Sequence, residues 1–348
     1  LAVKSATNRW WVRLTVGAVV IMIGFIASFS FVYWDVHRLV RPGAEVYRIN
    51  VGSGLSAFAT SLAERQVIER RWTFVAWAGA IGQLGKVKAG AYRFQEPTTL
   101  HAILGQLIRG EVVTYRVTLF EGWTTASMRN ALGVAPALVR LLPKIDDAHL
   151  REILAIAEQR SEGWFFPDTY HYNHGDTDIS ILQRAHHRMQ RMLADAWSTR
   201  NPALPLNSAY DALILASIVE KETAVNSEKP LIASVFTSRL ARGMRLQADP
   251  TVAYGLGSEF KGQLRRAHLT SDTPYNTYTR KGLPPSPISN PGRAALAAAT
   301  QPADTNFLYF VARGNGAHQF SATYPEHQKA VLAYRQTRRR QSSTSKQD

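Results

Sequence analysis

The chain has 348 residues, and 41 Lys and Arg residues against 26 Asp and Glu residues give it a formal net charge of +15. This length has room for a membrane segment and two modest domains. The absence of cysteine excludes disulfides, thiol nucleophiles and cysteine-based metal sites, and the positive charge indicates an anionic neighbour, either a lipid surface or an acidic polymer.

The first predicted element is a transmembrane helix over residues 14–34, which carry no charged side chain. At about 1.5 Å per residue this segment can cross a hydrocarbon core of about 30 Å. A cleavable signal peptide is the alternative, but the apolar run is too long for one and no small-residue cleavage site follows it. Residues 1–13 are slightly more basic than the segment after the span, which favours a cytoplasmic N-terminus and an extracytoplasmic body. The first residue is Leu1, which is compatible with a non-AUG start codon or a trimmed N-terminus.

A weak internal repeat follows the span and predicts a small α+β unit over residues 44–120. Each copy consists of a strand, a glycine turn at Gly54 or Gly122, and a Ser or Thr that can cap the next helix. The predicted strands are 47–51, 89–94 and 115–119, and the predicted helices are 56–65, 71–77, 98–109 and 124–132.

The rest of the chain predicts a mixed α+β domain over residues 121–335 and a basic, disordered tail over residues 336–348. The complete fold class is therefore α+β, with one N-terminal transmembrane helix ahead of two units. Predicted elements of the second domain are helices at 178–196, 208–223, 227–242 and 324–338 and a hairpin of strands 307–312 and 317–321.

The helix over residues 208–223 delivers a carboxyl group to the end of an apolar segment. At about 100° per residue, Leu215, Ile218 and Val219 lie on the same side as Glu222, whereas Glu220 points to the opposite side. If the apolar stripe packs inward, burial raises the pKa of Glu222 and keeps it protonated, as a general acid requires. The alternative is an ordinary solvated glutamate at a helix end.

Polar side chains gather in the segments after this helix. Asp249-Pro250 is predicted to form a turn, which makes Asp249 a structural residue rather than a second catalytic acid. Asn276 follows Pro274 and Asn290 precedes Pro291, so each is either a substrate contact or a turn residue.

These segments, in this order, resemble the endolytic murein transglycosylases of the MltG, or YceG-like, family. The resemblance extends from about residue 46 to about residue 334. The matching motifs are Glu-Gly-Trp-Phe-Phe-Pro-Asp-Thr-Tyr at 162–170, Glu-Lys-Glu-Thr at 220–223, Leu-Gln-Ala-Asp-Pro-Thr at 246–251 and Tyr-Asn-Thr-Tyr at 275–278.

The resemblance implies that Glu222 is the catalytic acid, with Glu220 as the second choice, and that residues 44–120 form a LysM-like subdomain. That subdomain either positions glycan or is a spacer above the membrane. Candidate substrate contacts are Gln247, Asn276, Tyr278 and Asn290, together with Glu162 and Tyr170 on a cleft wall.

The implied activity is lytic cleavage of peptidoglycan between MurNAc and GlcNAc within nascent strands, which leaves 1,6-anhydroMurNAc ends and limits strand length. One residue can then serve as acid and as base. We expect glycan strands and the membrane as partners, and the family implies peptidoglycan synthases as further partners. A membrane-anchored scaffold that binds peptidoglycan without cleaving it is the alternative function.

We expect no cofactor and no metal, since the sequence has no His-Glu-x-x-His motif and His186 and His187 are adjacent residues whose side chains diverge on a helix. A serine nucleophile elbow is also absent from the sequence. Nucleic acid is not an expected partner, because the basic residues are scattered, apart from Arg338, Arg339 and Arg340 near the C-terminus.

Overall fold

The computed structural model describes residues 4–50 and 52–344, and it has the mixed α+β composition that the sequence predicts. The chain divides into two compact units, one of which takes the chain up to Tyr115 together with Asn173–Gly175. The other unit takes Arg116–Tyr172 and the chain from Asp176 onward. The boundary falls inside strand β5 (Thr114–Thr118) rather than after residue 120, because β5 pairs with β6 (Thr169–Asn173). The assignment of the two units as LysM-like and catalytic stays a prediction.

Helix α1 (Lys4–His37) contains the predicted span and extends beyond both of its ends. Its part from Trp10 to His37 is long and apolar enough to cross a membrane. Most apolar side chains of this part are exposed, among them Ile21 and Phe25, whereas Val36 near its end is buried. An exposed apolar surface of this kind suits lipid rather than water. Residues 1–3 of the predicted cytoplasmic segment lie outside the described residues.

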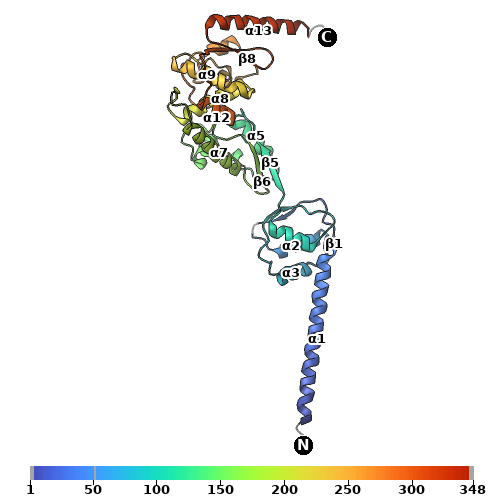
Figure 1. Ribbon diagram of the computed structural model, residues 1–348. Helices are drawn as coiled ribbons and strands as arrows, with labels where there is room; N and C mark the ends of the chain where they lie inside the picture. The colour runs from blue at the N-terminus through green and yellow to red at the C-terminus, as the bar shows by residue number, and fades with distance from the viewer. Residues whose placement is uncertain (1–3, 51, 345–348) are drawn as a thin grey trace. The chain divides into compact units, whose positions relative to one another are not determined.

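The remainder of the first unit matches the predicted small α+β arrangement (Figure 1). Two antiparallel pairs form, β1 with β4 and β2 with β3, and in the second pair Tyr47 lies opposite Tyr92. The aromatic rings of Tyr47, Phe58, Phe74 and Tyr92 are buried between these strands and the helices. The elements are β1 (Leu39–Val40), β2 (Tyr47–Ile49), α2 (Leu55–Glu64), α3 (Arg71–Ala80), β3 (Gly90–Tyr92), β4 (Thr98–Thr99) and α4 (Leu100–Arg109).

The predicted helix caps are half right. Thr124 caps α5 (Thr125–Val134), because its hydroxyl oxygen accepts a hydrogen bond from the Ser127 amide at 3.2 Å. The N-cap of α2 is Gly54 rather than Ser56, and it has no side chain to donate or accept. Gly122 is the turn glycine that the repeat predicts, with a left-handed φ of 72°.

The second unit is mainly helical and is built around α8 (Ala209–Glu222), which packs against α7, α9 and α12 (Figure 1). Its other elements are α6 (Asp147–Leu154), α7 (Asp178–Ser198), α9 (Lys229–Ala241), α10 (Asp249–Leu256), α11 (Arg266–Thr270), α12 (Arg293–Thr300), β7 (Tyr309–Ala312), β8 (His318–Ser321), α13 (Tyr324–Thr344) and the short 3₁₀ helices η1 (Leu142–Lys144), η2 (Asn226–Glu228) and η3 (Gly257–Glu259).

Helix α8 is buried on every side, not along one stripe as the sequence analysis assumed. Each residue from Ala212 to Val219 is buried, and exposure begins only in the last turn. Small and aliphatic residues allow this, because neighbouring helices can approach all faces of the helix closely. Helix α8 is therefore packed at the centre of the unit, and its C-terminal end carries the carboxyl group of Glu222.

The hairpin and helices α7, α8, α9 and α13 form where the sequence predicts them, whereas α6, α11 and α12 were not predicted. Two further differences concern α10 and the end of α13. Asp249-Pro250 begins helix α10 rather than a turn, since proline at the first helical turn costs no hydrogen bond. Helix α13 continues to Thr344 instead of ending near residue 338. The last part of the predicted disordered tail, residues 345–348, lies outside the described residues.

Candidate active site

Glu222 is the last residue of α8, and its side chain lines a cavity of ≈ 550 Å³. The cavity lies where the end of α8 meets α9, the start of α10, the hairpin β7–β8 and α13. Its other lining residues are Arg239, Leu246, Gln247, Asp249, Tyr278, Tyr309, Phe310, Val311, Ala312, His318, Tyr324, His327 and Val331.

The Glu222 carboxyl group is shifted toward its protonated form. Burial, and to a smaller extent the nearby charge of Asp249, together raise its pKa to about 8. None of the described residues 4–50 and 52–344 donates a hydrogen bond that would favour the carboxylate. Glu222 is therefore protonated at neutral pH, as the sequence analysis predicts for this end of the helix.

Asp249 and Tyr278 form a second polar group in the same cavity. The Tyr278 hydroxyl donates a hydrogen bond of 2.6 Å to Oδ1 of Asp249. Burial and this hydrogen bond raise the pKa of Tyr278, so it remains a neutral donor. Asp249 reaches the cavity because it is the first residue of α10, whose N-terminus favours a negative charge.

Arg239 supports one wall of the cavity from α9. Its guanidinium donates to the carbonyl oxygens of Leu308, at 2.7 Å, and Leu246, at 2.8 Å, and to Oε1 of Gln247 at 3.2 Å. These contacts join the hairpin to the segment that carries Gln247, whose backbone has a left-handed φ of 55°. A planar, rigid donor of this kind fixes several acceptors at once.

The hairpin is also tied to the chain just after Glu222. Glu228 accepts hydrogen bonds from the His318 amide at 2.8 Å and from the Thr223 hydroxyl at 3.3 Å, and it lies 2.7 Å from Nδ1 of His318. Burial would raise the pKa of Glu228, but the two contacts with His318 outweigh it and lower this pKa. The cavity is thus closed on the hairpin side by polar contacts and not only by packing.

Of the predicted site residues, the structure brings Glu222, Gln247 and Tyr278 together. Asn276 and Asn290 are fully buried outside the cavity. The Asn276 amide group donates to three backbone carbonyls, with Ser271 the closest at 2.7 Å. Both asparagines therefore act as the turn-holding residues that were the alternative, and their predicted contact with substrate gains no support from their positions.

Asn290 belongs to a separate buried network with Glu162. Oε1 of Glu162 accepts from the Thr125 amide at 2.9 Å and from the Asn290 side chain at 3.0 Å, and Oε2 accepts from the Tyr254 hydroxyl at 3.3 Å. Burial raises the pKa of Glu162 to about 7 despite these donors. Tyr170 is also buried, and its hydroxyl donates to the Phe166 carbonyl at 2.7 Å. Neither Glu162 nor Tyr170 lines the Glu222 cavity.

Glu220, the second choice for the acid, is occupied by a buried ion pair. Its Oε1 lies 2.8 Å from Nζ of Lys229, and its Oε2 accepts from the Gly292 amide at 2.9 Å. The two charged side chains are only 6% and 2% exposed. A carboxyl group held in this way anchors the end of α8 and does not line the Glu222 cavity.

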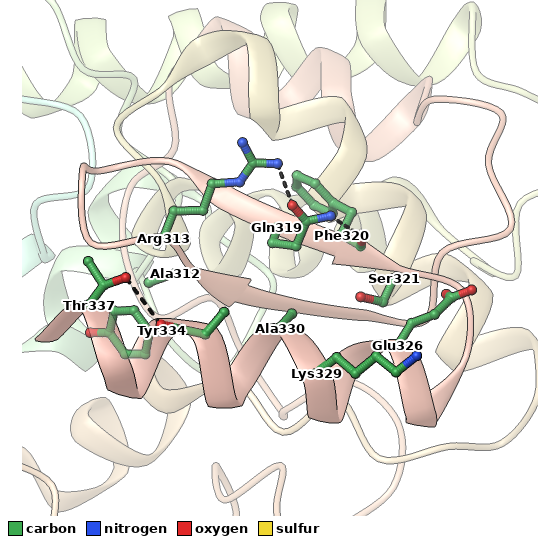
Figure 2. A pocket seen from close by; sticks show the side chains of 11 residues that line it. Ala312, Arg313, Gln319, Phe320, Ser321, Glu326, Lys329, Ala330, Tyr334 and Thr337 are labelled. Carbon is green, nitrogen blue, oxygen red and sulfur yellow. Dashed lines mark hydrogen bonds between the residues drawn. The ribbon is translucent and has the colours of Figure 1, made fainter.

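A different cavity of ≈ 550 Å³ lies between the hairpin β7–β8 and α13, and Figure 2 shows it from close by. Arg313 is held there by the side chain of Gln319. Glu326, which also lines this cavity, accepts from the Ala322 and Thr323 amides at the start of α13. This groove contains no carboxyl group that is free to act as an acid, so we place the candidate active site at Glu222.

No group of three or more His, Cys, Asp or Glu residues among the described residues is placed to hold a metal ion. The sequence missed Arg239 and undervalued Asp249. The signal for Asp249 was available, since Asp-Pro opens helices as well as turns. Arg239 gave none, because one arginine among several on α9 looks like surface charge until the hairpin is folded against it.

A carboxyl group whose pKa is raised by burial and that lines an open cavity can serve as a general acid, the class of residue on which acid–base enzymes depend. Comparison with known proteins is more specific. The model of the YceG-like family matches residues 47–333, and the chain belongs to this family.

Two relatives of this chain are named endolytic murein transglycosylases. An endolytic murein transglycosylase of Bacillus subtilis (strain 168) is 31% identical over 303 residues, which cover 81% of this chain and 82% of that protein. The endolytic murein transglycosylase of Streptococcus pneumoniae serotype 2 is 28% identical over 294 residues, which cover 75% of this chain and 53% of that protein. A crystal structure of a YceG-like protein from Listeria monocytogenes has a TM-score of 0.53 at 29% identity and covers 82% of this chain and 98% of that one.

Proposed function

We propose that this chain is a membrane-anchored endolytic murein transglycosylase with Glu222 as its catalytic acid. The observation that carries the proposal is the protonated Glu222 carboxyl group in an open cavity, on a chain whose relatives bear that name. Its substrate would be peptidoglycan, cleaved at the β-1,4 bond between MurNAc and GlcNAc.

Glu222 would act twice in one turnover. It first gives its proton to the glycosidic oxygen as the bond from that oxygen to C1 of MurNAc breaks. The C6 hydroxyl of the same sugar then bonds to C1 and returns its proton to Glu222, which leaves a 1,6-anhydroMurNAc end. This attack is intramolecular, with effective molarities on the order of 10⁵ M or more, so no water and no second acid–base residue is required.

The other polar groups of the cavity would serve the charge that develops at C1. The Asp249 carboxylate attracts an oxocarbenium-like centre, and Tyr278 and Gln247 supply neutral hydrogen-bonding groups beside it. Asp249 also holds Glu222 in its acidic form, which is a second contribution to the same step.

In the cell, α1 would anchor the chain in the plasma membrane by a single pass. Lys4, Arg9 and Arg13 precede the uncharged segment 14–34, and these basic residues favour a cytoplasmic N-terminus and an extracytoplasmic catalytic unit. Peptidoglycan synthases that make the nascent strands are proposed partners on the same side of the membrane. A non-catalytic scaffold is the weaker candidate, because a scaffold has no use for a protonated Glu222.

The test is to incubate the full chain in detergent with uncrosslinked glycan strands and to identify the product ends by mass spectrometry. Internal fragments that end in 1,6-anhydroMurNAc are the expected result. Reducing muramyl ends would instead indicate hydrolysis and a water-activating base. Intact strands with retained binding would favour the scaffold.

Replacing Asp249 by asparagine is expected to change the pH dependence of the reaction. The acid must be protonated, so kcat/KM should fall above a pH of about 8 in the parent chain. Removal of the Asp249 charge lowers the pKa of Glu222, and this fall should then begin at lower pH. Asp272→Asn is the matched control, because Asp272 is exposed and paired with Arg280 at 2.9 Å outside the cavity. Identical profiles for the two variants would disprove the coupling.

A further inference from the structure

A second cavity, of ≈ 570 Å³, lies against the Glu222 cavity and meets it at Asp249. Asp249 lines both cavities, one on each side. Lys221 lines the second cavity, while the next residue, Glu222, lines the first. The end of α8 and the start of α10 therefore form a shared wall, and open space continues on both sides of the candidate acid.

The lining of the second cavity suits an anionic, sugar-containing ligand. Its outer wall is the segment after η3, which contributes the half-buried ring of Phe260 and the exposed amide of Gln263. An aromatic face and an amide are common partners of a sugar ring and its hydroxyl groups. Lys221 adds an exposed cation, whose one hydrogen bond to a described residue is a long contact of 3.4 Å with the Gly122 carbonyl.

We propose that the second cavity binds the part of the murein strand on the far side of the scissile bond, and that Lys221 pairs with a carboxylate of the peptide carried by a muramyl residue there. This inference rests on the proposed function. A strand that crosses Asp249 has sugars in both cavities, and the bond between them passes the carboxyl groups of Glu222 and Asp249. Cleavage inside a strand, as opposed to at its end, requires binding space on both sides of the acid.

A strand without peptides carries one free lactyl carboxylate on each muramyl residue. A stem peptide converts that carboxylate to an amide and adds its own carboxylates farther from the sugar ring, where a lysine at the edge of the cavity can pair with them. Lys221 should therefore matter for strands that carry peptides, and Phe260 should matter for strands of either kind.

The test measures binding apart from turnover, in the full chain that carries Glu222→Gln, by titration calorimetry in detergent. The probes are synthetic murein octasaccharides that carry stem peptides and peptide-free octasaccharides whose lactyl carboxyl groups are blocked as simple amides. Adding Lys221→Ala should weaken binding of the peptide-bearing octasaccharide roughly tenfold and leave the peptide-free one unchanged. Adding Phe260→Ala should weaken binding of both by a similar factor.

Lys261→Ala is the matched control. Lys261 lies on the same segment as Phe260, and its replacement removes the same charge as Lys221→Ala. Its Nζ contacts the Ser258 carbonyl at 3.2 Å, and it does not line the cavity. Equal affinities for the Lys221→Ala and Lys261→Ala chains would overturn the proposal, as would a Phe260→Ala chain that binds like its parent. If the chain without Glu222→Gln cleaves strands and these variants bind normally, the proposed function stands and the second cavity does not serve it. If strands bind through Lys221 and Phe260 but are never cleaved, the cavity stands and the proposed function fails.

Discussion

Glu222→Gln is expected to lower turnover of glycan strands by a factor of about 10³ or more while the chain stays folded. Glutamine has the shape of the glutamic acid but no proton to give, so the glycosidic oxygen would leave as an unprotonated alkoxide. The measurement is the rate at which 1,6-anhydroMurNAc ends form, for the parent chain and the variant. Undiminished turnover would move the chemistry to another residue.

Glu222→Gln should also stabilise the fold at neutral pH. A loss of activity in a more stable chain would be due to the missing acid and not to unfolding. The pKa of Glu222 is raised from its ordinary 4.5 to about 8, so between these two values the folded chain keeps a proton that the unfolded chain has released. The free energy of unfolding of the parent therefore falls as pH rises through this window and levels off above it. The glutamine variant lacks this loss and should gain on the parent from pH 5 to pH 8.

Urea unfolding of both chains at pH 5 and pH 8 measures that difference. Each pH unit inside the window contributes about 1.4 kcal/mol, so a gain of a few kcal/mol from pH 5 to pH 8 is expected, a cost that buried catalytic carboxyl groups commonly carry. If the variant were less stable at pH 8 than its parent, Glu222 would be a structural acid, and its loss of activity would carry no information about mechanism.

The sequence predicts those features of this site that depend on the geometry of one helix. The apolar run before Glu222 and the opposite direction of Glu220 follow from helix geometry alone, and the structure confirms that the two acids have different surroundings. The sequence also predicts the hairpin and most helices, since their hydrophobic periods and turn residues are local. Gln247 and Tyr278, which were predicted to lie near Glu222, line its cavity because the segments next to them cover the end of α8.

What the sequence could not report is the surroundings of residues whose partners lie in distant parts of the chain. Asn276 and Asn290 look like polar ligands in the sequence, but buried backbone groups need partners, and these amides supply them. Glu162 bonds to Thr125 and Asn290, which are far from it in sequence. No local pattern reports such pairings. Arg239 was missed for the same reason, because its acceptors lie on the hairpin and on the segment after α9.

Lys229→Ala is expected to cost about 3–5 kcal/mol of stability, the usual effect of removing one partner from a buried ion pair. Among the described residues, the Gly292 amide would then be the remaining hydrogen-bond donor to Glu220, whose side chain is 6% exposed. Lys229 also begins α9, where a cation opposes the helix dipole, so the carboxylate offsets an unfavourable position as well. Urea unfolding at pH 7 gives the difference directly.

Glu220→Gln distinguishes this structural role from catalysis. Glutamine preserves an oxygen for the Gly292 amide but leaves the Lys229 charge with Glu121 alone, whose carboxylate is 4.0 Å away. We therefore expect a destabilised chain whose folded fraction still cleaves strands, the reverse of the result for Glu222→Gln. A stable Glu220→Gln chain without turnover would instead make Glu220 the acid. The two variants thus identify the acid by opposite effects. Glu222→Gln should lose activity and gain stability, because the buried carboxyl group of Glu222 costs stability. Glu220→Gln should keep activity and lose stability, because the ion pair of Glu220 anchors the end of α8.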